Sequence, residues 1–297
     1  MSKVVDLSSL PDLLAEGPTG RAKIERQARA IAELSESLDL MARRSRPYEV
    51  PIRGRDNVIR FGLIGDTHFG SLYQRPDALK VFYGACEKEG VTDVLHAGDV
   101  LAGWRVYKGQ EFELHPNGRS WPEQRDMFAA LAPRAKGVTT HFITGNHDAS
   151  FKKLIGLVAG PDLEAARPDW KFVGQDVGDV TLKARNGLSF HVRLVHPGGG
   201  TSYAVSYRMQ KMIESISGGR KPDMLASGHY HKAETLPSYR NVFGVDVGCF
   251  EDQTPFMASR ASAAHVGGWI VTVSLNDRSK LTARVQTEWI GFFEPTE

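Results

Sequence analysis

Several short motifs of aspartate, asparagine and histidine have the residue types and spacing to bind metal ions. In Gly-Asp-Thr-His at residues 65–68, Asp66 and His68 lie two positions apart and present an oxygen and a nitrogen. One such motif is weak evidence, because an Asp-His pair is often only a hydrogen-bonded couple. Related motifs follow at Gly-Asp 98–99, Gly-Asn-His-Asp 145–148, His196 and Gly-His-Tyr-His 228–231. Their recurrence indicates a metal site.

Each motif follows a short apolar run that predicts a β-strand. These runs span residues 58–64, 91–96, 138–144, 190–195 and 224–227. The first is typical of a buried parallel strand, because it is short, has strand-forming residues and is closed by Gly65. Open α/β sheets place their sites beyond the carboxyl ends of such strands. We therefore expect the polar side chains to gather at one edge of a sheet.

In this order, the motifs resemble the signature of the calcineurin-like metallophosphoesterases. That signature is Asp-x-His, Gly-Asp, Gly-Asn-His-Asp, His and Gly-His-x-His, and the chain contains every part of it. The resemblance extends from about Arg55 to the C-terminus. From His196 through Gly-His at 228–229 to Gly-Cys-Phe-Glu-Asp at 248–252, the chain is most similar to the branch of recombination and repair exonucleases and archaeal DNA polymerase small subunits.

The resemblance implies a centre of two divalent metal ions. One ion would be bound by Asp66, His68, Asp99 and His231. The second would be bound by Asp99, Asn146, His196 and His229, so that Asp99 bridges the two. Oxygen and nitrogen donors without a thiolate favour Mn²⁺, with Fe, Zn²⁺ or Ni²⁺ as alternatives. Such a pair lowers the pKa of bound water, and the resemblance implies that a bridging hydroxide attacks the phosphate ester.

Two further residues of the third motif are predicted to be catalytic. The resemblance implies that His147 donates a proton to the leaving oxygen or stabilises the transition state. Asp148 is expected to orient either His147 or its loop. The histidines at positions 96, 141, 191 and 265 lie within predicted strands, on a hairpin or before a turn, and we interpret them as structural.

An aromatic and basic insertion at residues 104–126 follows the second motif. Loops of this length beside a strand end usually serve a function. The predicted substrate-binding residues are Trp104, Arg105, Tyr107 and Lys108, with Tyr203 on a later helix. Alternatively, the two tryptophans of the insertion cap the edge of the core. The later helix is expected to begin at Thr201 or Ser202, where its first amides would lie near the site and attract an anion.

These features favour a phosphodiesterase that acts as a DNA or RNA nuclease. A phosphomonoesterase or a cyclic-nucleotide phosphodiesterase would use the same centre. A non-catalytic scaffold, as in the retromer subunit of this superfamily, is less favoured because every predicted ligand and His147 are present. A nucleic-acid substrate would need a local basic patch, since the net charge is only +2.

The predicted fold class is α/β (α+β), a four-layer αββα sandwich of two stacked mixed sheets flanked by helices. The chain has 297 residues, of which 41% are hydrophobic, enough for one large domain and a small appendage. We predict a metallophosphoesterase domain at residues 55–297. Asn-Gly at 186–187 predicts a hairpin. Strands near 242–247, 269–274 and 281–289 are expected to complete the second sheet.

Residues 1–54 are predicted to be a helical N-terminal extension ending in a basic linker. Its amphipathic helix would pack on the catalytic domain, form a homodimer or bind a partner protein, and a DNA-binding helix pair is the alternative. No apolar stretch reaches 18 residues, and Asp6 falls where a signal peptide would be apolar. We therefore expect a cytoplasmic protein without a membrane contact. Cys86 and Cys249 are predicted core residues.

Overall fold

A computed structural model describes residues 48–51, 58–184, 187–200, 202–275 and 283–293. The chain divides into two compact units, Met1–Arg46 and Pro47–Glu297, and every described residue belongs to the second. The predicted N-terminal helix therefore lies outside the described residues. None of the helices in the described part is long and apolar enough to cross a membrane.

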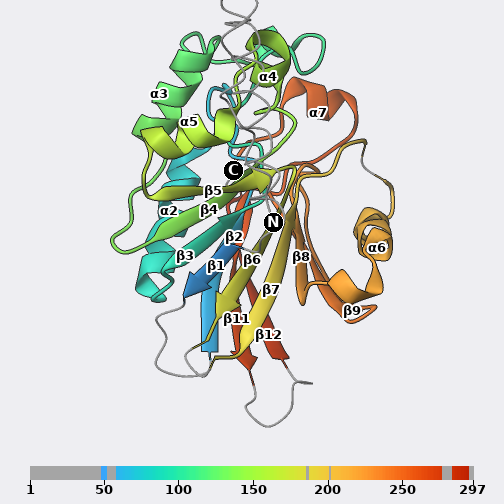
Figure 1. The fold of residues 1–297 in the computed structure, drawn as a ribbon. Coiled ribbons are helices and arrows are strands. Elements are labelled where there is room, and N and C mark those ends of the chain that lie inside the picture. Colours follow the sequence, from blue (N-terminus) through green and yellow to red (C-terminus); the bar gives the residue numbers. More distant parts are fainter. Residues whose placement is uncertain (1–47, 52–57, 185–186, 201, 276–282, 294–297) are drawn as a thin grey trace, which may run out of the picture. The chain divides into compact units, whose positions relative to one another are not determined.

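The described unit contains two six-stranded sheets and several helices (Figure 1). The strands are β1 (Tyr48–Pro51), β2 (Val58–Ile64), β3 (Asp93–His96), β4 (Thr139–Thr144), β5 (Trp170–Gln175), β6 (Val177–Lys183), β7 (Ser189–Val195), β8 (Met224–Ser227), β9 (Ala233–Tyr239), β10 (Val242–Val247), β11 (Gly267–Leu275) and β12 (Ala283–Gly291). The helices are α2 (Pro76–Lys88), α3 (Trp121–Leu131), α4 (Ser150–Ile155), α5 (Ala159–Ala166), α6 (Val205–Ser215) and α7 (Pro255–Ser259), with 3₁₀ turns at Gln110–Phe112 and Gly218–Arg220.

Both sheets are mixed, and each contains a parallel group whose ends supply the site. The first sheet has the order β12-β11-β2-β3-β4-β5, in which β2 to β5 are parallel. The second has the order β1-β6-β7-β8-β10-β9, in which β7, β8 and β10 are parallel. The parallel groups of both sheets therefore deliver their following loops to the site.

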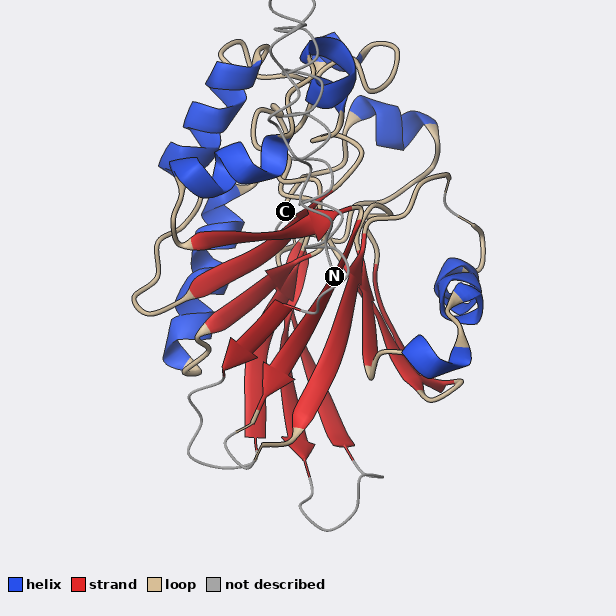
Figure 2. Ribbon diagram, viewed as in Figure 1, coloured by secondary structure: helices blue, strands red, loops and turns tan. Residues whose placement is uncertain are grey.

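Alternating side chains build a core on each side of the first sheet. In β2, Ile59, Phe61 and Leu63 pack against apolar side chains of the second sheet. On the outer face, Phe82 of α2 and Phe128 of α3 belong to a second apolar cluster. Helix α6 packs on the far face of the second sheet through a third cluster. The four-layer αββα order is thus confirmed, and Figure 2 shows the helices outside the two sheets.

Two expectations about this architecture are wrong. Strands β11 and β12 do not join the second sheet, because β11 pairs antiparallel with β2 over Val58 to Leu63 and extends the first. Helix α6 begins at Val205 with Ala204 as its N-cap, not at Thr201 or Ser202. The hydroxyl of Ser202 instead donates to the carbonyl of Ala204, at 2.6 Å. The expected anion site at the start of this helix stays a prediction.

Other expectations match the structure closely. The predicted strands at 58–64, 224–227 and 242–247 have the observed bounds. Strands β6 and β7 pair antiparallel, as the hairpin signal predicts. Both cysteines are buried. Strand β1 falls within the segment expected to be extension and linker, yet it pairs with β6. The division into domains at residue 54 stays a prediction.

Candidate metal centre

The predicted ligands converge from loops of both sheets. The donor atoms of Asp66, His68 and His231 lie within 4.8 Å of one another, and so do those of Asp99, His196 and His229. Asn146 joins the second group, because its Oδ1 lies 3.1 Å from Nε2 of His196. The side chains of all seven predicted ligands therefore lie around a single centre, although they come from the loops after five different strands.

Within each group the donor atoms lie unusually close together. The Nε2 atoms of His68 and His231 are 3.1 Å apart, and Nε2 of His231 lies 3.3 Å from Oδ1 of Asp66. In the second group, Nε2 of His196 lies 3.0 Å from Oδ2 of Asp99. Two imidazole nitrogens that face each other beside a carboxylate form the kind of donor set that binds a divalent cation. Both aspartates are almost completely buried.

The backbone is strained where most of these side chains emerge. Five of the seven predicted ligands have positive φ, namely Asp66 (52°), His68 (44°), Asp99 (54°), His229 (79°) and His231 (53°). Residues other than glycine rarely adopt this left-handed conformation, and it costs about 1–3 kcal/mol per residue. Such strain concentrates at functional sites, where the surrounding structure compensates for it. Here hydrogen bonds join the loops, including those from the amides of Asp66 to Gly98 O and of Thr67 to Asp99 O.

Two glycines allow the loops to approach this closely. A Cβ atom on Gly145 would lie 2.3 Å from Oδ1 of Asp99, and one on Gly228 would lie 2.7 Å from Oδ2 of Asp66. Each glycine precedes a predicted ligand in the chain. Any side chain at either position would push a carboxylate out of the centre, so the glycines of the sequence motifs have a steric role.

Opposite charges stabilise the ionised forms of the buried groups. Burial by itself would raise the pKa of Asp66, but hydrogen bonds from His231 and His68 hold it well below its usual value. Burial would likewise lower the pKa of His196, whereas the adjacent Asp99 raises it to about 9. In the absence of metal, histidine cations thus neutralise the carboxylates. A divalent ion would take over that positive charge.

His147 lies at the edge of the centre. Its Nδ1 is 2.5 Å from the carbonyl oxygen of Ala102, so this nitrogen carries the proton and donates it to the carbonyl. The Nε2 atom lies 4.0 Å from Oδ2 of Asp99, and the imidazole contacts His68 edge-on. Burial lowers the pKa of His147 to about 4. Its donor atoms also form a possible ligand group with His68 and Asp99.

Asp148 holds two of the loops together. Its carboxylate accepts hydrogen bonds from the amides of Val100, Leu101 and Gly145, at 3.1, 2.8 and 2.9 Å. Of the two roles considered for Asp148, this geometry matches orientation of the loops rather than of the His147 ring. Burial, together with the charge of Asp99, raises the pKa of Asp148 to about 7.

Glu251 is a buried carboxylate at the centre that the motif analysis did not assign. It follows β10, lies 3.8 Å from Nε2 of His68 and 4.0 Å from Nδ1 of His231, and is only 6% exposed. The Nδ1 of His231 has no hydrogen-bond partner among the described residues. The signal was available, because residues 248–252 follow a predicted strand in the same way as the recognised motifs do.

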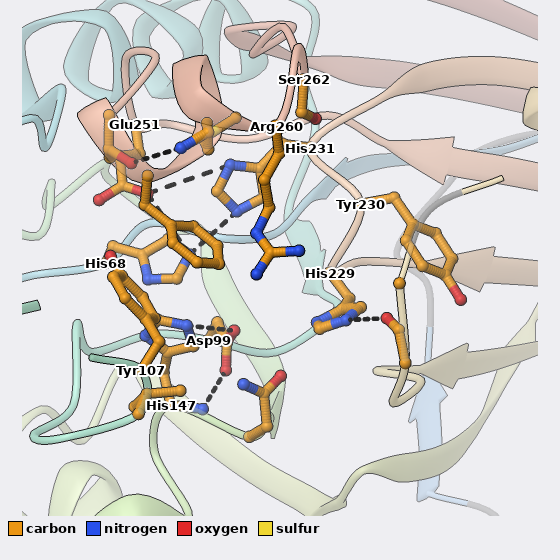
Figure 3. Close-up of a pocket in the computed structure, with 17 residues that line it drawn as sticks. His68, Asp99, Tyr107, His147, His229, Tyr230, His231, Glu251, Arg260 and Ser262 are labelled. Carbon is orange, nitrogen blue, oxygen red and sulfur yellow. Dashed lines mark hydrogen bonds and ion pairs between the residues drawn. The ribbon is translucent and has the colours of Figure 1, made fainter. Parts of the chain in front are cut away.

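A cavity of about 590 Å³ opens over the centre (Figure 3). Its wall includes Tyr107, His147 and Glu251, together with Phe256 of α7 and Arg260 just after it. A smaller cavity of about 250 Å³ adjoins it, and Asn146 and Val106 line both. Phe256 and Arg260 could not be recognised from the sequence, because the segment 254–262 contains no known motif.

The predicted substrate-binding residues are not all at these cavities. Tyr107 lines the larger cavity, and Trp104 and Arg105 line the smaller one. Lys108 is exposed and lines neither, and Tyr203 is fully exposed and lines neither. Trp121, the second tryptophan of the insertion, packs edge-on against Phe151 in the core. The four histidines interpreted as structural each form a hydrogen bond within the fold.

The two sheets and the cluster of aspartate and histidine side chains define a metal-dependent phosphoesterase. A family model, the calcineurin-like phosphoesterases, matches residues 59–233, and the chain belongs to this family. Membership of this family supports a hydrolase, and the groups of aspartate and histidine side chains suggest a dinuclear divalent-metal site.

Curated relatives and solved structures show further similarities. The chain is 26% identical over 239 residues to the DNA polymerase II small subunit of Halobacterium salinarum, in two strains, as expected from the resemblance. The match covers 69% of this chain and 46% of the relative, so the chain spans about half of that relative's length. Similar structures include Vps29 from Entamoeba histolytica, at 17% identity and TM-score 0.36 over 79% of this chain and 100% of that one. A dimetal phosphatase from Danio rerio matches at 12% identity and TM-score 0.40 over 78% and 96% of the two chains.

We expect Asp148→Asn to loosen the loops by exchanging an acceptor oxygen for an amide donor that faces backbone N–H groups. At pH 8.5, above the pKa of Asp148, the ionised wild type also bears the repulsion of Asp99, which the amide removes, so the readout is the local contact and not the free energy of unfolding. Hydrogen exchange at the amides of Val100, Leu101 and Gly145 should be faster in Asp148→Asn, because these amides lose a carboxylate acceptor. Asp126→Asn, at an exposed ion pair, is the matched control and should leave exchange at these amides unchanged. Equal effects of the two variants would contradict the role of Asp148.

Proposed function

We propose that the protein is a dinuclear metal-dependent phosphodiesterase, and that its substrate is DNA or RNA. The observation that carries the proposal is the pair of donor groups around Asp66 and Asp99, placed beneath an open cavity. No thiolate is present among them, which favours a transition metal such as Mn²⁺ that accepts mixed oxygen and nitrogen donors.

The residues present fit two divalent ions. Asp66, His68 and His231 would hold one, with Asp99 shared, and Asn146, His196 and His229 would complete the other. The fit is supported by the short separation of His68 and His231, whose facing Nε2 atoms both lie near Oδ1 of Asp66. When bound, such ions lower the pKa of a water molecule and neutralise phosphate oxygens.

His147 is placed to act on the leaving group. Its Nδ1–H is committed to the Ala102 carbonyl, which fixes the ring and leaves Nε2 directed to the centre. A protonated Nε2 can donate to the departing oxygen of a phosphodiester, and a neutral one can only accept. In the absence of metal and substrate, burial favours the neutral form. The negative charge of a bound phosphate would favour the protonated one.

The smaller cavity supports a polynucleotide substrate. Trp104 offers an aromatic face, Arg105 lies over it at 5.9 Å, and Lys153 adds a second cation. Arg105 has a strained φ of 57°, which is expected where a side chain must be held in a particular place. Aromatic faces bind bases and cations follow the phosphate backbone of a single strand. Because Asn146 lines both cavities, one strand could cross the centre and enter the smaller cavity.

The similarity to a DNA polymerase small subunit supports a nucleic-acid context and a partner protein. That relative is named as a subunit, and this chain spans less than half of its length. The predicted N-terminal helix is the segment proposed to bind the partner or a second copy of the chain.

Removal of metal should abolish hydrolysis reversibly. We expect the protein loaded with Mn²⁺ to cleave at least one of single-stranded DNA, duplex DNA, RNA and a chromogenic diester, and to leave a chromogenic monoester largely intact. Treatment with a chelator followed by metal analysis should show that activity and metal content fall together and return together. Activity that persists after complete metal removal would contradict the two-metal assignment.

Substitutions of Asp99 and His147 should lower turnover for different reasons. Asp99→Ala removes the shared carboxylate, so metal content and turnover should both fall. His147→Ala should keep its metal while turnover falls by about 10² to 10⁴, the range for a general acid. The loss should be smallest for a nitrophenyl diester, whose leaving group needs little protonation. Metal depletion in His147→Ala would show that this residue is a ligand, as its proximity to His68 and Asp99 permits.

Replacing Trp104, Arg105 and Lys153, which line the smaller cavity, together with Ala should weaken cleavage of polynucleotides and spare a small chromogenic diester. The physical reason is that these side chains would contact nucleotides beyond the one being cleaved. The ratio of kcat/KM for the two substrates is the measurement. A triple variant of exposed residues outside both cavities, Phe112, Arg134 and Lys136 to Ala, is the control. An equal loss on both substrates would show that the insertion supports the fold instead.

A further inference from the structure

A stack of side chains forms one wall of the larger cavity. The rings of Tyr107 and Phe256 stack at 4.1 Å with an interplanar angle of 20°, and the guanidinium of Arg260 lies 4.7 Å from the Phe256 ring. Glu113 joins the two aromatic residues, because it accepts from the Tyr107 hydroxyl at 2.6 Å and from the Phe256 amide at 2.7 Å. Glu113 therefore links the loop of Tyr107 to the start of α7, and both parts of the wall are fixed relative to each other.

The short helix α7 fixes the backbone beneath Arg260. The hydroxyl of Thr254 accepts from the amide of Met257 at the start of the helix. At its end, the amides of Arg260 and Ser262 both donate to the carbonyl of Met257, at 3.0 Å. The base of the Arg260 side chain is thus held in place, while the side chain points into the cavity (Figure 3).

Arg260 differs from most arginines of the described chain in its partner. Seven of the others pair with a carboxylate, namely Arg60, Arg75, Arg125, Arg134, Arg167, Arg193 and Arg240. Within the described residues, the guanidinium of Arg260 pairs with no carboxylate, and its contact is the ring of Phe256. A guanidinium on an aromatic face keeps its N–H edge available for an anion.

The net charge of the metal-loaded centre explains why a further cation would help to bind a phosphate. Two divalent ions would carry four positive charges, and Asp66, Asp99 and Glu251 would remove three of them. A hydroxide from water would remove the fourth, so a phosphodiester anion would meet a neutral centre. Because Glu251 is not among the ligands predicted from the sequence, the need for another cation becomes visible only in the structure.

We infer that Arg260 binds the non-bridging oxygens of the phosphate being cleaved, and that Tyr107 and Phe256 position it. The inference rests on the proposed function and extends it by a substrate-binding residue. Arginine suits this task because its planar fork donates two parallel hydrogen bonds to a phosphate. The group is always charged, so the contact persists over the pH range of the reaction.

Inorganic phosphate is the probe that separates this inference from the proposed activity. Binding of phosphate to the metal-loaded protein is measured by calorimetry for the wild type, Arg260→Ala and Arg260→Lys. We expect the Kd to rise about tenfold or more in Arg260→Ala and less in Arg260→Lys, which keeps the charge but loses the fork. Metal content and the melting temperature should not change, because Arg260 touches no predicted ligand. Phe256→Leu should give an intermediate Kd.

Arg240→Ala is the matched control, because Arg240 also lies over an aromatic ring, that of Tyr239, but outside both cavities. In parallel, kcat/KM for a diester should fall by about 10² in Arg260→Ala, as for loss of one oxyanion donor. An unchanged phosphate Kd in Arg260→Ala would overturn the inference even if the wild type is an active enzyme. A weakened Kd without hydrolysis of any substrate by the wild type would refute the proposed activity and leave the phosphate site standing.

Discussion

The structure depends on the burial of two carboxylates, Asp66 and Asp99, in one place between two sheets. A buried charge is costly unless a counter-charge and hydrogen bonds accompany it. Here the histidines of four loops surround the pair, and backbone amides donate to both, including His229 N to Asp66 and His147 N to Asp99. The close glycines, the strained φ angles and the amide contacts of Asp148 all follow from the need to bring these groups together.

The centre also requires that both sheets be packed. Asp66, Asp99 and Asn146 follow strands of the first sheet, whereas His196 and His229 follow strands of the second. The apolar side chains between the sheets, such as Phe61 and Leu194, set the distance at which these loops meet. A cavity in that core would therefore change the positions of the ligands at the metal site.

Much of the fold and the centre could be predicted because both depend on local patterns. A short apolar run followed by glycine and a polar residue specifies a strand end, and parallel strand ends share an edge. The pairing of β11 with β2 could not be predicted, because an apolar run such as residues 269–274 is compatible with either sheet. Glu113 and Arg260 were missed for a related reason. Their importance comes from neighbours that are distant in sequence, such as Tyr107 beside Phe256.

The larger cavity is lined by predicted metal ligands and by residues of longer loops, and these two groups are positioned differently by the fold. The predicted ligands lie within four residues of a strand end, where the sheet limits how the backbone can change. Arg105, Tyr107 and Arg260 lie on loops that leave the sheet and return, and such loops tolerate changes in length and composition. Loops of this kind can therefore change while the loops that carry the predicted ligands stay intact. This separation explains how members of one family can share a reaction and differ in the molecules that they cleave.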